Sequence, residues 1–152
     1  MAKMTINGLD ELIARLEKAG RKPEAIVKQA LYEGAGVVAD AIRASVASIP
    51  ENESKGTRAH PKLGITGVEK AGLLSGIGIS QMRVENETVN LVIGFNGTNA
   101  DGTKNTTVMR RAESGTSFQK KTPAVRPAVT RSKKAAQDAM QKVFTDELEK
   151  LL

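Results

Sequence analysis

Apolar side chains recur at every third or fourth position in the N-terminal third of the chain, a spacing that predicts amphipathic helices. After a short strand at residues 4–6, a first helix is expected between an N-cap at Asn7 and a stop at Gly20. Its apolar stripe consists of Leu9, Leu12, Ile13 and Leu16. A second helix is expected over residues 23–50, and at ~1.5 Å per residue it is roughly 40 Å long. Because one small domain does not need such a length, we expect this helix also to meet a partner.

The period of the pattern changes to two in the middle of the chain. Alternation over residues 73–84 predicts one strand, and a second strand follows a turn at residues 85–87. The residues that share one face of the second strand are Val89, Leu91, Ile93 and Phe95. Together the two strands form an antiparallel hairpin, which is marginal alone. We expect residues 4–6, the segment near Thr116 or a neighbouring subunit to extend it.

Two polar segments, rich in glycine, proline and asparagine, interrupt these elements. Residues 50–70 are expected to form a long mobile loop, and residues 96–105 a second loop. A short helix is then expected to end at Gly115, in the left-handed conformation that glycine adopts readily. Two prolines bias Thr122 and Arg126 to extended conformations, and Pro127 is placed to start a last amphipathic helix.

These elements predict an α+β fold, in which a small antiparallel sheet packs against a long helix, with amphipathic helices at both ends of the chain. A length of 152 residues is that of one domain, so residues 1–152 are expected to share one core. That core is aliphatic, because the chain has only three Phe, one Tyr and no Trp. The absence of apolar runs near the ~20 residues of a membrane span, and of a signal-peptide pattern, points to a cytoplasmic protein.

Candidate catalytic chemistry is sparse. The chain has no cysteine, which excludes disulfides, thiolate nucleophiles and cysteine-based metal sites. The one histidine, His60, lies in the polar loop without a second histidine or an evident carboxylate partner, so a solvated side chain is favoured. Residues 34–39 match a relaxed dinucleotide-binding fingerprint, but no strand precedes them, so small residues that allow a close helix contact are the better interpretation. We therefore expect no enzyme activity, no cofactor and no metal.

The net charge of +6 is concentrated in one segment. Residues 104–134 contain nine basic residues and one acidic residue, a net charge of +8, whereas residues 1–103 are balanced. Such a segment would neutralise DNA phosphates, which makes a basic nucleic-acid-binding protein of phage or prophage origin the alternative interpretation. Against it, the segment has no interleaved aromatic residues and no clear recognition helix.

Four short motifs occur in a characteristic order. They are Gly-Leu-Asp-Glu-Leu at 8–12, Gly-Leu-Leu-Ser at 72–75, Glu-Ser-Gly-Thr-Ser at 113–117 and Pro-Ala-Val-Arg-Pro-Ala at 123–128. With the predicted elements between them, they resemble the tail-completion or head-tail joining (neck) protein family of long-tailed bacteriophages and prophages. The resemblance covers nearly the whole chain.

The resemblance implies a structural protein of the virion tail or neck, which forms a ring, commonly a hexamer, that completes the tail and joins it to the head connector. The expected partners are copies of the chain itself, the connector or stopper and the tail-tube protein, with non-specific DNA contact in the channel and no membrane. The location is the virion, and the host cytoplasm during assembly. We expect the assembly interface to include Glu113, Gly115, Thr116, Pro123, Arg126 and Pro127. Glu113 would pair with Arg126 or with an arginine of a neighbour, and Gly115 would supply a positive φ; a satisfied surface turn within one subunit is the alternative.

Overall fold

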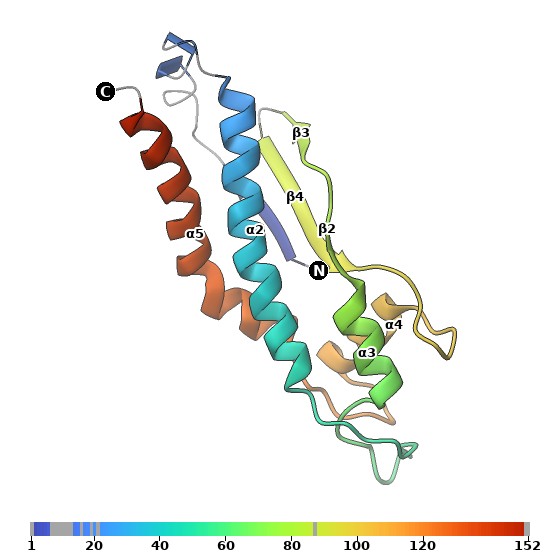
Figure 1. Cartoon of the computed structure of the whole chain (residues 1–152). Helices are drawn as coiled ribbons and strands as arrows, with labels where there is room; N and C mark the ends of the chain where they lie inside the picture. The colour runs from blue at the N-terminus through green and yellow to red at the C-terminus, as the bar shows by residue number, and fades with distance from the viewer. Residues whose placement is uncertain are drawn as a thin grey trace.

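The computed structural model describes residues 2–6, 14–15, 17–18, 20, 22–86 and 88–150 and has the expected α+β architecture (Figure 1). In chain order the elements are β1 (Ala2–Ile6), α2 (Pro23–Ala47), α3 (Gly67–Gly76), β2 (Ile77–Ile79), β3 (Arg83–Glu85), β4 (Thr88–Phe95), α4 (Asn105–Ser114) and α5 (Val125–Glu149). The first predicted helix, with its stripe from Leu9 to Leu16, lies largely outside the described residues. Among the described helices, none combines the length and apolar character that a membrane span requires.

The sheet is built around β4, to which every other strand pairs in the antiparallel sense. β1 lies along one edge of β4, with Met4 opposite Leu91, and β2 and β3 lie along the other edge, with Ile79 opposite Ile93. The predicted hairpin is confirmed where β3 meets β4. Its predicted extension by the first residues of the chain is confirmed as well, since β1 completes a four-stranded sheet.

The strand predicted over residues 73–84 is wrong in its first half. Residues 67–76 form α3, because the Thr66 hydroxyl accepts a hydrogen bond from the Glu69 N–H while the Glu69 carboxylate accepts one from the Thr66 N–H, both at 3.1 Å. This reciprocal capping box starts a helix that the alternating pattern conceals. The loop predicted over residues 50–70 therefore ends at Thr66. After β2 the pairing changes at Ser80. The Ser80 N–H donates to the Val92 carbonyl at 2.8 Å, but the Val92 N–H donates to the Ser80 hydroxyl, also at 2.8 Å, and regular pairing resumes at β3.

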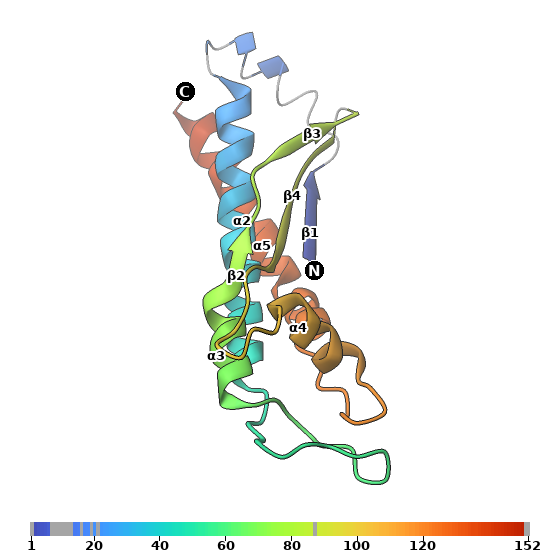
Figure 2. The same cartoon turned by 90° about the vertical axis from the view of Figure 1, so that its right-hand side faces the viewer.

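The two long helices lie on the same side of the sheet (Figure 2). α2 packs along α5 and also contacts β1, β2 and β4. The buried positions of α2 extend from Ile26 to Val46, and α5 covers much of that surface. The expected contact of α2 with a partner remains a prediction. α5 bends in its first half (Figure 1), where the buried Ser132 hydroxyl donates to the Ala128 carbonyl at 2.7 Å, a bond that often bends helices.

Gly34 marks the point where three elements converge. A Cβ there would lie 2.7 Å from Met140 Cγ of α5 and 2.8 Å from Met4 Cε of β1, whereas a Cβ at Gly36 would meet nothing within 4 Å. The small residues in the segment 34–39 were predicted to let another element approach the helix closely, and this is confirmed at Gly34.

These two glycines make a matched pair of test positions. We expect Gly36→Ala to raise the free energy of unfolding by about 0.5–1 kcal/mol through helix propensity alone. For Gly34→Ala we expect almost no net change, because the cost of displacing Met140 Cγ and the Met4 methyl group offsets the same gain. Gly34→Leu should cost about 1–3 kcal/mol through overpacking. Urea unfolding followed by circular dichroism measures all three, and equal stabilisation at both positions would contradict the close packing at Gly34.

Candidate assembly site

The segment between α4 and α5 is organised by the carboxylate of Glu113. Its Oε2 accepts hydrogen bonds from the backbone N–H groups of Ala124 (2.7 Å) and Val125 (3.0 Å), and its Oε1 accepts one from Arg126 (2.9 Å). The first N–H groups of a helix have no partner within the helix, and the N-cap residue Ala124 has no polar side chain to supply one. Glu113 therefore caps α5 from the preceding helix, with a negative charge at the positive end of the helix dipole.

This arrangement corrects two expectations about Arg126. Glu113 bonds to the backbone of Arg126, and the guanidinium acts on the carboxylate through its charge rather than through a hydrogen bond. Arg126 is also not extended, because it is the second residue of α5. The residue before a proline normally avoids the helical region, but here three charge-assisted hydrogen bonds fix the first turn. Pro127, predicted to start the helix, is instead its third residue, where its missing N–H costs nothing because the first N–H groups of a helix have no partner within it.

The environment of Glu113 shifts its acidity. Partial burial by itself would raise the pKa of the Glu113 carboxyl, but the backbone donors of Arg126, Ala124 and Val125, with the nearby charge of Arg126, outweigh burial and lower the pKa below its ordinary 4.5. The carboxylate is thus held in the charged form that the cap requires.

The other predicted site residues shape the turn between the two helices. Gly115 has φ 75°, as predicted, and its N–H donates to the Arg111 carbonyl at 2.8 Å, which ends α4. The Thr116 N–H donates to the Gln119 carbonyl at 2.8 Å and so closes a tight turn. Pro123 is exposed just before α5. The structure brings these residues together with Glu113 and Arg126 in the connection between α4 and α5, residues 113–127, which we call the joint.

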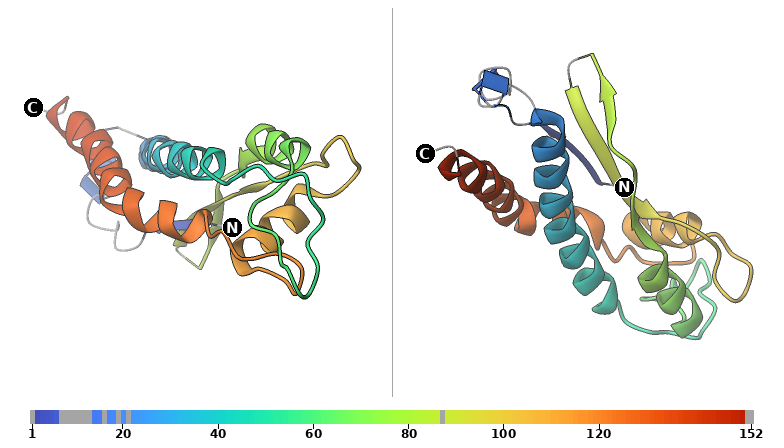
Figure 3. Two further views of the ribbon diagram at one scale, coloured as in Figure 1. Left: turned by 90° about the horizontal axis from the view of Figure 1, so that it is seen from below. Right: turned by 45° about the horizontal axis from the view of Figure 1, so that its top comes forward.

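This turn pairs with the loop at residues 50–66, a contact that the sequence did not indicate. The Lys62 N–H donates to the Phe118 carbonyl at 3.0 Å, and the Lys120 N–H donates to the Lys62 carbonyl at 2.8 Å. Residues 50–66 and 115–123 lie side by side at one end of the molecule (Figure 3, left), and we call them together the distal tip. The mobility predicted for the first loop remains a prediction, but these hydrogen bonds join it to the rest of the fold.

Phe118 is the prominent side chain of the distal tip. It is 49% exposed, and the guanidinium of Arg58 lies 5.8 Å from its ring centre. Gly56 passes so close to this turn that a Cβ would collide with the Phe118 carbonyl oxygen. His60 is exposed in the same loop, as expected from its polar surroundings.

An open pocket lies beside the joint, between the end of β4, α4 and the start of α5. Its volume is about 370 Å³. It is lined by Phe95, Thr106, Met109, Arg110, Glu113, Ser114, Val125 and Arg126. Its buried apolar lining, which we call the floor, consists of Phe95, Met109 and Val125, and two other lining residues, Arg110 and Arg126, are exposed arginines. Because Glu113 already accepts three backbone hydrogen bonds, the charge that the pocket offers to a partner is positive.

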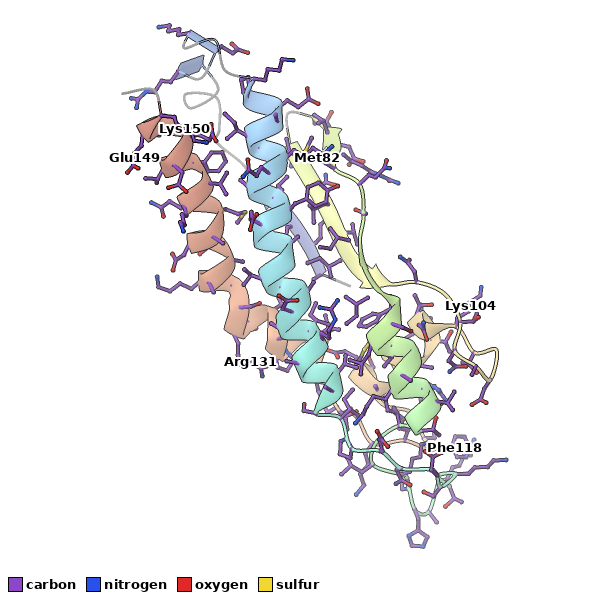
Figure 4. The ribbon with its side chains drawn as sticks, viewed as in Figure 1. Met82, Lys104, Phe118, Arg131, Glu149 and Lys150 are labelled. Carbon is purple, nitrogen blue, oxygen red and sulfur yellow. The ribbon has the colours of Figure 1, made fainter. Side chains whose placement is uncertain are left out.

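Two of the basic residues of the 104–134 segment lie apart in the fold. Figure 4 shows Lys104 at the right of the molecule and Arg131 at the left. The positive charge of the segment is therefore not gathered at a single point. Within the described residues, no group of three or more His, Cys, Asp and Glu side chains is placed to hold a metal ion.

Comparisons of the chain with protein-family models, with curated proteins and with solved structures found no match. The geometry of the joint, the distal tip and the pocket is therefore the basis for the function proposed below.

Proposed function

We propose that the protein is a structural component of a bacteriophage virion, located in the neck or tail, where copies form a ring that completes the tail and joins it to the head connector. The observation that carries the proposal is the joint between α4 and α5. The motifs that resemble the neck protein family, residues 113–117 and 123–128, meet there. The Glu113 carboxylate already accepts three backbone hydrogen bonds at the start of α5. Arg126 is left exposed, with its guanidinium available to a second molecule.

The division of labour within the joint supports assembly over a purely internal role. An internal surface turn needs Glu113 and Gly115, which fix the chain path, but it does not need an arginine beside an open apolar pocket. In protein interfaces, arginine and buried aromatic groups carry much of the binding energy, and an arginine fork suits a partner carboxylate. Arg126 and the pocket have this combination.

The test is the mass of the protein by light scattering over a concentration series, alone and with a tail-tube protein. We expect Arg126→Ala to weaken self-assembly about tenfold or more, as loss of an interface hot spot does, while circular dichroism and thermal unfolding stay unchanged. Arg131→Ala is the matched control, because Arg131 is an exposed arginine on the same helix but outside the pocket. An Arg126→Ala protein that assembles like the wild type would contradict the role of the joint.

The same preparations address the alternative function. A protein that lines a DNA channel would bind DNA weakly, without sequence preference and with a steep loss of affinity as salt rises. Binding that distinguishes DNA sequences at physiological salt would instead favour a nucleic-acid-binding protein.

A further inference from the structure

We infer that the pocket beside Arg126 receives the β3–β4 hairpin of a second copy of the chain, with Val84 on the apolar floor and Glu85 between Arg110 and Arg126. This inference rests on the proposed self-assembly and names the two surfaces that meet.

The pocket requires an occupant that is both apolar and acidic. Phe95, Met109 and Val125 supply apolar surface, and burying apolar groups against it is favourable. Neither Arg110 nor Arg126 has a side-chain hydrogen bond or close ion pair with another described residue, although the charge of Arg126 acts on Glu113. A carboxylate brought to them would meet two guanidinium groups that still have their hydrogen-bond donors available, and guanidinium groups bind carboxylates in a fork-like geometry.

Among the described residues, few exposed apolar side chains have a free acid beside them. The large hydrophobic residues that are most exposed in this part of the chain are Leu63, Val68, Ile79, Val84 and Phe118. Leu63 and Phe118 belong to the distal tip, where the adjacent charges are basic. Ile79 is followed by uncharged residues. The acid next to Val68, Glu69, is already bonded to Arg111 at 2.8 Å.

Val84 and Glu85 satisfy both requirements. Val84 is the most exposed of the five, at 63%, and Glu85 next to it is exposed. Within the described part of the chain, the Glu85 carboxylate has no hydrogen bond or ion pair. All three residues of β3 are exposed, and the hairpin extends away from the body of the molecule (Figure 3, right).

The hairpin of one molecule cannot fill the pocket of that same molecule. Figures 1 and 2 both place β3 at the upper end and α4 in the lower half, with the length of β4 between them. The contact therefore joins two copies through two different surfaces. Such head-to-tail contacts form a closed ring when the rotation between copies closes, which is the assembly proposed above.

Because the chain has no cysteine, introduced thiols test this contact directly. Copies carrying Val84→Cys are mixed with copies carrying Thr106→Cys at the pocket edge, under a mild oxidant, and disulfide-linked pairs are separated by electrophoresis. The control mixture combines Val84→Cys with Gln137→Cys, an exposed position of α5 outside the pocket. We expect the first mixture to yield at least about tenfold more linked pairs, and Arg126→Glu in the Thr106→Cys copy to remove the excess.

A charge exchange adds a second readout. Glu85→Arg should shift the wild-type assembly toward monomers, and the combined Glu85→Arg and Arg126→Glu variant should restore its mass. If wild-type protein assembles but both mixtures link equally, this contact is wrong while the proposed ring stands. If the mass stays that of a monomer at all concentrations, with and without a tail-tube protein, and no excess linkage forms, the contact and the proposed ring both fail.

Discussion

Gly64→Ala is expected to lower the free energy of unfolding by about 3 kcal/mol or more, an unusually large effect for one added methyl group. Gly64 has φ 104°, a backbone conformation that L-amino acids rarely adopt. An added Cβ would also collide with the Pro50 carbonyl oxygen. That carbonyl accepts the Ile65 N–H at 3.0 Å, and Ile65 is fully buried, so moving the backbone at residue 64 disturbs a core residue as well.

Gly102→Ala separates the two causes. Gly102 has a similar positive φ of 81°, but a Cβ there would meet nothing within 4 Å. We expect it to cost only about 1–2 kcal/mol, the strain of the backbone conformation itself. Urea unfolding of the wild type and both variants gives the comparison. Equal losses at the two glycines would show that the contact between Gly64 and Pro50 does not matter.

Three of the described helices, α2, α4 and α5, were predictable from the sequence because their causes are local. Pro23 begins α2, Gly115 ends α4 with a positive φ, and three-and-four spacing follows the buried face of α2. The first half of the strand predicted over residues 73–84 was wrong, because leucines, glycines and isoleucines fit a period of two as well as a short buried helix. The deciding feature was the pair Thr66 and Glu69, a recognisable capping box that stands immediately before the pattern.

The candidate site was predictable only in part. Its motif residues do meet at the joint, but the partner of Glu113 is the backbone of residues 124–126. Nearly every residue type has the same backbone N–H group, so a sequence does not show which ones a carboxylate will bind. The pairing of Lys62 with Gln119 joins loops 57 positions apart, for which no periodicity exists. Arg110 was counted as one more basic residue, because only the fold places it at the same pocket as Phe95 and Arg126.

The cap on α5 gives the second large effect, and it should depend on pH. At neutral pH we expect Glu113→Gln to lower the free energy of unfolding by about 2 kcal/mol, because a neutral amide accepts the three backbone N–H groups less strongly than a carboxylate. The loss in the free energy of unfolding is not larger because Glu113 is only half-buried and water can reach part of the cap. Glu33→Gln, at an exposed position of α2, is the control and should change stability by no more than about 0.5 kcal/mol.

The sign of the pH dependence follows from the direction of the pKa shift. The pKa of Glu113 is lower in the folded protein than its ordinary 4.5, so the unfolded chain takes up the proton first as the pH falls. The stabilisation by the cap is therefore fully present above pH 4.5 and is lost as the pH drops through the folded pKa. Urea unfolding from neutral to acidic pH should show the gap between wild type and Glu113→Gln shrinking below that point, while the Glu33→Gln gap stays near zero. A gap that stays constant into acid would mean that Glu113 acts through its shape rather than its charge, and that α5 does not depend on a charged cap.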